Sequence, residues 1–159
     1  MNLRESLVKN NSIALHQSVC SWEEAIKIGT DLLEKNNIVT SEYYKAIIAS
    51  INKLGAYIVL APGIAMPHAR PEQGVLETGF ALTTLDTPIK LEGEDTPIKL
   101  LITLAGSTGD AHIEGVMQIT QILEDDEAED GVNIEKFLNC NTSEEVIAIV
   151  DEALAKYAE

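Results

Sequence analysis

The residues best suited to chemistry lie in one short stretch, Leu60-Ala61-Pro62-Gly63-Ile64-Ala65-Met66-Pro67-His68-Ala69-Arg70-Pro71. Its prolines and its glycine restrict the backbone to a turn, a short extended segment and a second turn. Pro67 fixes its own φ and pushes Met66 toward an extended conformation, so we expect His68 at a strand end on a stiffened backbone. A neutral imidazole is nucleophilic near neutral pH when an acceptor holds its second ring nitrogen. His68 is therefore the first candidate for a nucleophile.

Arg70 follows two residues after His68. Its guanidinium is planar, permanently charged and matched to the oxygen atoms of phosphate. The Pro-His-x-Arg pattern thus favours the handling of a phosphoryl group by His68 and Arg70. The residues alone leave open the alternative that His68 is a loop histidine without a catalytic role.

His112 is the second candidate, within Ser107-Thr108-Gly109-Asp110-Ala111-His112-Ile113-Glu114. Small and polar residues are followed here by an apolar helical pattern, which places His112 in the first turn of a helix. Unpaired N–H groups and the helix dipole favour an anion at that position. A solvent-facing histidine without a function is the alternative. His16 has no supporting context, and we expect it at the surface.

Metal and cysteine chemistry are less well supported. His68, His112 and Asp110 could form a ligand set of two histidines and a carboxylate, but the spacing argues against it and there is no His-Glu-x-x-His arrangement. The glycines form no nucleotide-binding pattern. Cys20 and Cys140 belong to no paired pattern, so we interpret both as reduced, inert thiols.

The elements that position these residues follow from periodicity and capping signals. Apolar residues at helical spacing predict two helices that pack together, at residues 21–36 and 41–55, with Ser21 and Ser41 as caps. Pro and Gly turns then separate four strand-like runs, at 57–60, 64–66, 78–85 and 98–105. Further helices are predicted at 112–124, 134–138 and 143–157, the last opened by a capping box at Ser143.

The run 98–104 is too apolar for a half-exposed strand, so we expect it in the centre of a sheet that helices cover on both faces. The predicted fold class is α/β (α+β), a three-layer α/β/α arrangement with a central mixed β-sheet.

Composition limits the classes of partner. The chain has 159 residues and 45% hydrophobic content, which predicts one compact domain over residues 1–159. Its formal net charge of -15 argues against nucleic acid as a partner and favours a basic protein surface. The first residues lack the apolar core of a signal peptide, and no stretch is long enough to span a bilayer, so we expect a cytoplasmic protein.

The run "APGIAMPHARPEQGV", with the later "AHIEGVMQI", resembles the enzyme IIA domains of the mannitol and fructose family of the bacterial phosphoenolpyruvate-dependent sugar phosphotransferase system, most closely the ascorbate type. The resemblance covers essentially the whole chain. It implies that His68 accepts a phosphoryl group from the phosphocarrier HPr and passes it to a cysteine of an enzyme IIB, with the membrane enzyme IIC as an indirect partner. It further implies that His112 is the second histidine of the site, and that no metal or organic cofactor is needed.

One departure from the family concerns the cation. Mannitol-type members carry an arginine on the helix before the active-site strand, and the closest match here is Asn52, beside Lys53. Arg70 is the residue we expect to replace that cation. We further expect partners to dock on an apolar patch around the loop 62–71, with Ile64 and Met66 as candidate members and a rim of acidic residues that meets positive residues on HPr.

Two questions stay open at this level. A regulatory, nitrogen-type enzyme IIA that signals by its phosphorylation state is the alternative to a transport component. A homodimer is the second open point, with Trp22, Tyr43 and Tyr44 as candidate interface residues, although burial in the core is the commoner role of such residues.

Overall fold

The computed structural model describes residues 2–91 and 93–158. In chain order the elements are α1 (Leu3–Asn10), β1 (Ile13–Gln17), α2 (Trp22–Lys35), α3 (Ser41–Leu54), β2 (Val59–Ala61), β3 (Ile64–Ala65), the 3-10 helix η1 (Pro71–Gln73), β4 (Gly79–Ile89), β5 (Ile98–Ala105), α4 (Gly109–Leu123), α5 (Glu135–Leu138) and α6 (Ser143–Ala155).

The strands form one five-stranded sheet in the order β1-β4-β5-β3-β2. β1 is parallel to β4, β4 is antiparallel to β5, β5 is parallel to β3, and β3 is antiparallel to β2. The sheet is therefore mixed, as predicted. β5 matches the predicted strand 98–105 and occupies the central position, because an apolar run of this kind is stable only where both faces are covered.

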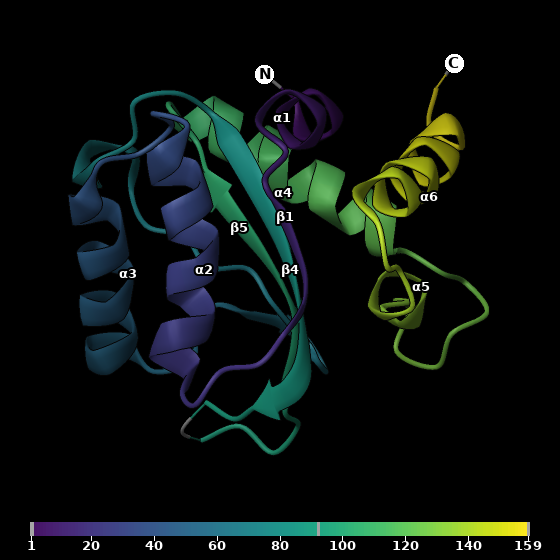
Figure 1. Cartoon of the computed structure of the whole chain (residues 1–159), viewed down its shortest axis with the longest axis horizontal. Helices are drawn as coiled ribbons and strands as arrows, with labels where there is room; N and C mark the ends of the chain where they lie inside the picture. Colours follow the sequence, from purple (N-terminus) through teal and green to yellow (C-terminus); the bar gives the residue numbers. More distant parts are fainter. Residues whose placement is uncertain (1, 92, 159) are drawn as a thin grey trace.

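Helices cover both faces of the sheet (Figure 1). α2 and α3 lie side by side on one face, and α1, α4 and α6 lie on the other. Each face has its own buried cluster, and β5 contributes to both: Leu101 and Ala105 join the α2–α3 side, while Leu100, Ile102 and Leu104 join the opposite side. The predicted three-layer α/β/α arrangement is confirmed.

Residues 3–17 fold into two elements that the sequence pattern did not predict, α1 and β1. Two buried serines explain the weak apolar pattern of this segment. The Ser6 hydroxyl accepts from the Phe80 N–H at 2.9 Å, and the Ser12 hydroxyl donates to the Phe80 carbonyl at 2.5 Å. Because these hydroxyls are satisfied by the backbone of β4, polar residues occupy positions that normally carry apolar ones.

The helix starts follow the capping pattern with a shift of one residue in two cases. Ser21 caps α2, as predicted, and its hydroxyl accepts a first-turn N–H at 3.2 Å. Thr40 and not Ser41 caps α3, and Thr142 and not Ser143 caps α6. In both cases the threonine has the extended backbone that a cap requires, so the serine becomes the first helical residue.

Candidate functional site

His68, His112 and Arg70, the three predicted site residues, border one open cavity of about 660 Å³. The cavity lies where α3, the segment 68–73 and the beginning of α4 meet. The other side chains that border it include Ala46, Ala49, Ser50, Lys53, Leu54 and Tyr57. The structure thus brings together residues that are far apart in the sequence.

The backbone before His68 is held by the sheet. The Met66 N–H donates to the Ile58 carbonyl at 2.7 Å, and the Leu104 N–H donates to the Pro67 carbonyl at 3.0 Å. Pro67 adds its own restriction on φ. These constraints agree with the stiffened strand end that the proline pattern predicted for His68.

The His68 ring has a defined orientation. Its Nδ1 lies 2.7 Å from the Met66 carbonyl oxygen. A carbonyl can only accept, so Nδ1 carries the proton of the neutral ring and Nε2 keeps its lone pair. The side chain is half-buried. This is the arrangement that nucleophilic attack by Nε2 requires.

His112 lies beside His68, with ring centroids 5.1 Å apart. α4 begins at Gly109 after the cap Thr108, three residues earlier than expected, so the His112 N–H is already bonded to the Thr108 carbonyl. Burial, followed by the proximity of His68, lowers the pKa of His112 below its ordinary value. A neutral His112 can donate a hydrogen bond from one ring nitrogen, and it places no additional positive charge beside the His68 ring.

The phase of α3 decides which cation faces the cavity. Tyr43, Ile47 and Ile51 form its buried stripe, and a second stripe that includes Ala46 and Lys53 borders the cavity. Asn52 instead borders a different pocket beside Trp22 and Leu91. Asn52, the closest sequence match to the family arginine, therefore does not border the His68 cavity, because adjacent helical residues differ by about 100° in direction. Lys53 and Arg70 are the cations at the cavity.

Lys53 and Tyr57 also border the cavity, although neither was predicted as a site residue. Ala46, Ala49, Ser50 and Lys53 recur at helical spacing, and this pattern of small residues ending in a cation was a usable signal for Lys53. Tyr57 lies in the turn after α3, where no periodicity identifies its direction.

Ile64 and Met66 cannot take part in the expected docking patch, because they are only 0% and 7% exposed. Ile64 lies in β3, between β5 and β2, and Met66 follows this strand directly. On the two helices that border the cavity, the exposed large apolar side chains are Leu54 at the end of α3 and Ile113 and Met117 on α4.

His16 is at the surface, as expected, and both nitrogens of its ring have hydrogen-bond partners. Its Nδ1 lies 2.8 Å from the Asp86 carboxylate and its Nε2 lies 2.8 Å from the Cys140 carbonyl. Both partners accept hydrogen bonds, so these contacts favour the protonated, cationic form of the ring. The hydrogen bond to Asp86, followed by the one to Cys140, raises the pKa of His16. His16 does not border the His68 cavity.

Groups of metal-binding side chains and the two cysteines are the other features with possible chemistry. In residues 2–91 and 93–158, no three His, Cys, Asp or Glu side chains are grouped as metal ligands. Cys20 and Cys140 are both free, and burial raises the pKa of the Cys140 thiol, which disfavours its reactive thiolate.

None of the described helices combines the length and apolarity needed to cross a bilayer. Tyr43, one of the candidate interface residues, is fully buried in the core.

Comparison with known proteins identifies the family of the chain. Residues 6–153 match the family described as phosphoenolpyruvate-dependent sugar phosphotransferase system, EIIA 2. An ascorbate-specific PTS system EIIA component of Salmonella typhimurium is 43% identical over 157 residues, which cover 98% of this chain and 99% of that protein.

Two solved structures from Escherichia coli share the fold. The mannitol-specific cryptic phosphotransferase enzyme IIA CmtB has a TM-score of 0.81 and 34% identity, over 96% of this chain and 99% of that one. Enzyme IIA-Mtl in complex with phosphorylated enzyme IIB-Mtl has a TM-score of 0.74 and 25% identity, over 89% of this chain and 94% of that one. The chain therefore belongs to the EIIA 2 family of the phosphoenolpyruvate-dependent sugar phosphotransferase system and is a phosphotransferase component of the EIIA type.

Proposed function

We propose that the chain is a cytoplasmic phosphocarrier that works as one domain over residues 1–159, accepting a phosphoryl group from phospho-HPr on His68 and transferring it to a cysteine of an enzyme IIB. The observation that carries the proposal is the hydrogen bond from His68 Nδ1 to the Met66 carbonyl. It leaves the Nε2 lone pair of a half-buried histidine at a cavity that also holds two cations.

The chemistry balances without an external proton. In the first step Nε2 of His68 attacks the phosphorus, a P–N bond forms, and the P–N bond to the donor histidine breaks. The electron pair of that broken bond returns to the donor nitrogen, and the His68 proton stays on Nδ1, hydrogen-bonded to the Met66 carbonyl, throughout. In the second step the thiolate of enzyme IIB attacks, a P–S bond forms, and the electron pair of the broken P–N bond returns to Nε2. His68 ends in its starting tautomer, ready for another cycle.

The remaining site residues stabilise the phosphoryl oxygens. His112 donates a hydrogen bond from its neutral ring, consistent with its lowered pKa. Lys53 and Arg70 supply positive charge from α3 and from the segment before η1. Stabilisation of the charge that is shared among the equatorial oxygens is the main contribution a protein makes to phosphoryl transfer.

Full-length similarity to ascorbate-specific EIIA components supports ascorbate uptake as the process served, with enzyme IIC as the indirect partner. The complex of a relative with phosphorylated enzyme IIB supports direct docking of a IIB protein. Partners dock over exposed Leu54, Ile113 and Met117. Asp110 and Glu114 on the same helix α4 attract a basic partner surface.

The test uses labelled phosphoenolpyruvate, enzyme I and HPr, followed by the purified IIB proteins of the ascorbate and mannitol systems. We expect label on the wild-type chain that resists alkali and is lost in acid, as a phosphohistidine requires, and faster transfer to the ascorbate IIB. His68→Ala should abolish labelling. Acid-labile label that persists in this variant would contradict the assignment.

A matched pair on α3 tests the cation. Lys53→Ala should slow transfer by about tenfold, less than the ~10²–10³ typical of a preorganised buried donor, because this side chain is exposed and flexible. Asn52→Ala changes the neighbouring exposed residue outside the cavity and should leave the rate unchanged. Equal rates for both variants would remove Lys53 from the proposed mechanism.

A further inference from the structure

The peptide unit that follows His68 is held on both sides by tyrosine hydroxyl groups. The Tyr57 hydroxyl donates to the His68 carbonyl oxygen at 2.5 Å, and the Ala69 N–H donates to the Tyr43 hydroxyl oxygen at 3.0 Å. The Tyr43 proton goes to the Leu104 carbonyl at 2.6 Å, near the end of the central strand β5. Both polar groups of one peptide are thus fixed by phenols, and one of these phenols ties the peptide to the sheet.

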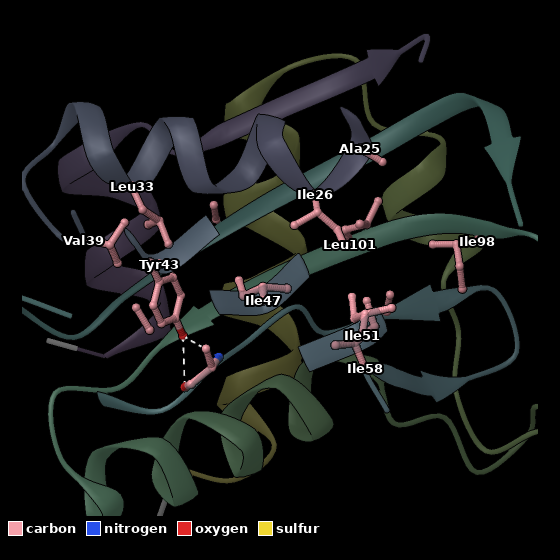
Figure 2. Close-up of a cluster of buried hydrophobic side chains, with 14 of the residues drawn as sticks. Ala25, Ile26, Leu33, Val39, Tyr43, Ile47, Ile51, Ile58, Ile98 and Leu101 are labelled. Atoms are coloured by element: carbon pink, nitrogen blue, oxygen red, sulfur yellow. Dashed lines mark hydrogen bonds between the residues drawn. The ribbon is translucent and has the colours of Figure 1, made fainter. Parts of the chain in front are cut away.

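The two tyrosines differ in their surroundings. Figure 2 shows Tyr43 within the buried cluster beneath α2 and α3, with its oxygen directed out of the cluster toward its hydrogen-bond partners. Tyr57 is half-buried and borders the His68 cavity. Tyr43 therefore belongs to the core, whereas Tyr57 belongs to the wall of the site.

Tyr57 also contacts the reacting ring. Its ring and the His68 imidazole are nearly perpendicular, at 80°, with centroids 5.1 Å apart. The His112 ring approaches the imidazole at the same centroid distance of 5.1 Å. Neighbouring rings and the bond from Nδ1 to Met66 together leave the imidazole little freedom to rotate. Burial raises the pKa of the Tyr57 phenol, so it remains a hydrogen-bond donor at neutral pH.

We propose that Tyr57 is a positioning residue for phosphoryl transfer. Its hydroxyl fixes the His68–Ala69 peptide and its ring borders the imidazole. These two contacts keep Nδ1 hydrogen-bonded to the Met66 carbonyl and Nε2 directed at the incoming phosphorus. The inference rests on the proposed function of His68. The physical reason is that the peptide plane sets ψ of His68 and with it the direction of the side chain. A displacement of about 1 Å at a reacting atom costs about 10²-fold in rate.

The test compares two variants that each lose one phenol hydroxyl. Tyr57→Phe keeps the ring and removes the hydrogen bond to His68. Tyr44→Phe is the control, because the Tyr44 hydroxyl donates to the Glu23 carbonyl at 3.3 Å and Tyr44 does not border the cavity. We expect Tyr57→Phe to lower the maximal rate of transfer to enzyme IIB by about tenfold, the effect of losing one hydrogen bond. The half-saturating concentrations of HPr and IIB should not change, and Tyr44→Phe should match the wild type.

A spectroscopic measurement separates positioning from a purely structural role. Nitrogen NMR of His68 should show protonated Nδ1 as the dominant tautomer in the wild type, and a larger share of protonated Nε2 in Tyr57→Phe. Dominance of protonated Nε2 in the wild type would by itself overturn the inference, whether or not the variant folds. A wild-type maximal rate in Tyr57→Phe would also overturn the inference. A change in the half-saturating concentrations alone would overturn it too, because it would make Tyr57 a docking residue. If the wild-type chain takes no label from phospho-HPr, the proposed function fails instead.

Discussion

Gly106 allows His112 to approach the site, and an added methyl group there gives a quantitative test of the geometry. A Cβ at this position would lie 2.8 Å from both the Cα and the backbone nitrogen of His112, where ordinary contact begins at 3.4 Å. The obstructing atoms are helix backbone, which cannot rotate away. Gly106→Ala must therefore move the start of α4 by about 0.6 Å or more relative to β5.

The expected cost follows from this displacement. Overpacking should destabilise the protein by about 1–3 kcal/mol, which leaves an ordinary domain folded. Since about 1 Å of misplacement costs about 10²-fold, we expect transfer to enzyme IIB to slow by roughly 10–100-fold. Phosphorylation of His68 should still occur, because His68 itself is held by Met66 and Tyr57.

The assay is the rate of label transfer to enzyme IIB, measured with urea unfolding of the same samples. Gly109→Ala is the control: it adds a methyl group to the first turn of the same helix, but its Cβ meets no heavy atom within 4 Å. Although Gly109 also borders the cavity, we expect its variant to stay within about twofold of the wild type. A folded Gly106→Ala protein with the wild-type transfer rate would refute the reasoning that the position of His112 matters.

The remaining predictions concern stability. The Thr83 hydroxyl is buried and has no hydrogen-bond partner among the described residues, so Thr83→Val should raise the free energy of unfolding by about 1 kcal/mol. Thr84→Val should lower the free energy of unfolding by a similar amount, because the Thr84 hydroxyl accepts the His16 N–H at 2.8 Å. Urea unfolding of both variants measures this contrast, and a loss of stability in Thr83→Val would contradict the prediction. The contacts of His16 with Asp86 and Cys140 raise its pKa, so their contribution is complete below the ordinary histidine pKa of 6.5 and is lost as pH rises through the folded value. The stability difference between wild type and His16→Gln should therefore shrink from pH 6 to pH 9, and a difference that grows over this range would be inconsistent with a cationic ring.

Two features of the site were predictable from sequence because they depend on neighbouring residues. Pro67 restricts φ of its own residue and the conformation of Met66 wherever the segment is placed, so a stiffened backbone at His68 follows from covalent geometry. The strand at 98–105 was equally accessible, since its continuous apolar run is stable only in the middle of a covered sheet.

Capping patterns identified α2, α3 and α6, but they placed the caps of α3 and α6 one residue too late. Serine and threonine compete as caps at adjacent positions, and the winner is the residue with an extended backbone, as at Thr40 and Thr142. The segment before residue 21 was missed for a different reason. Ser6 and Ser12 are polar in sequence but buried in the structure, where the Phe80 backbone satisfies their hydroxyls.

The assembly of the site was decided by tertiary packing alone. The pairing of His68 with His112 depends on the close contact between Gly106 and α4, which no local pattern encodes. The choice of Lys53 over Asn52 depends on the rotation of α3, which is set by the burial of its other face against the sheet. Local sequence therefore singled out His68 as the candidate nucleophile and determined how stiffly its backbone is held. The residues that surround His68 were determined by how the helices pack on the sheet, because packing brings together residues that are distant in the chain.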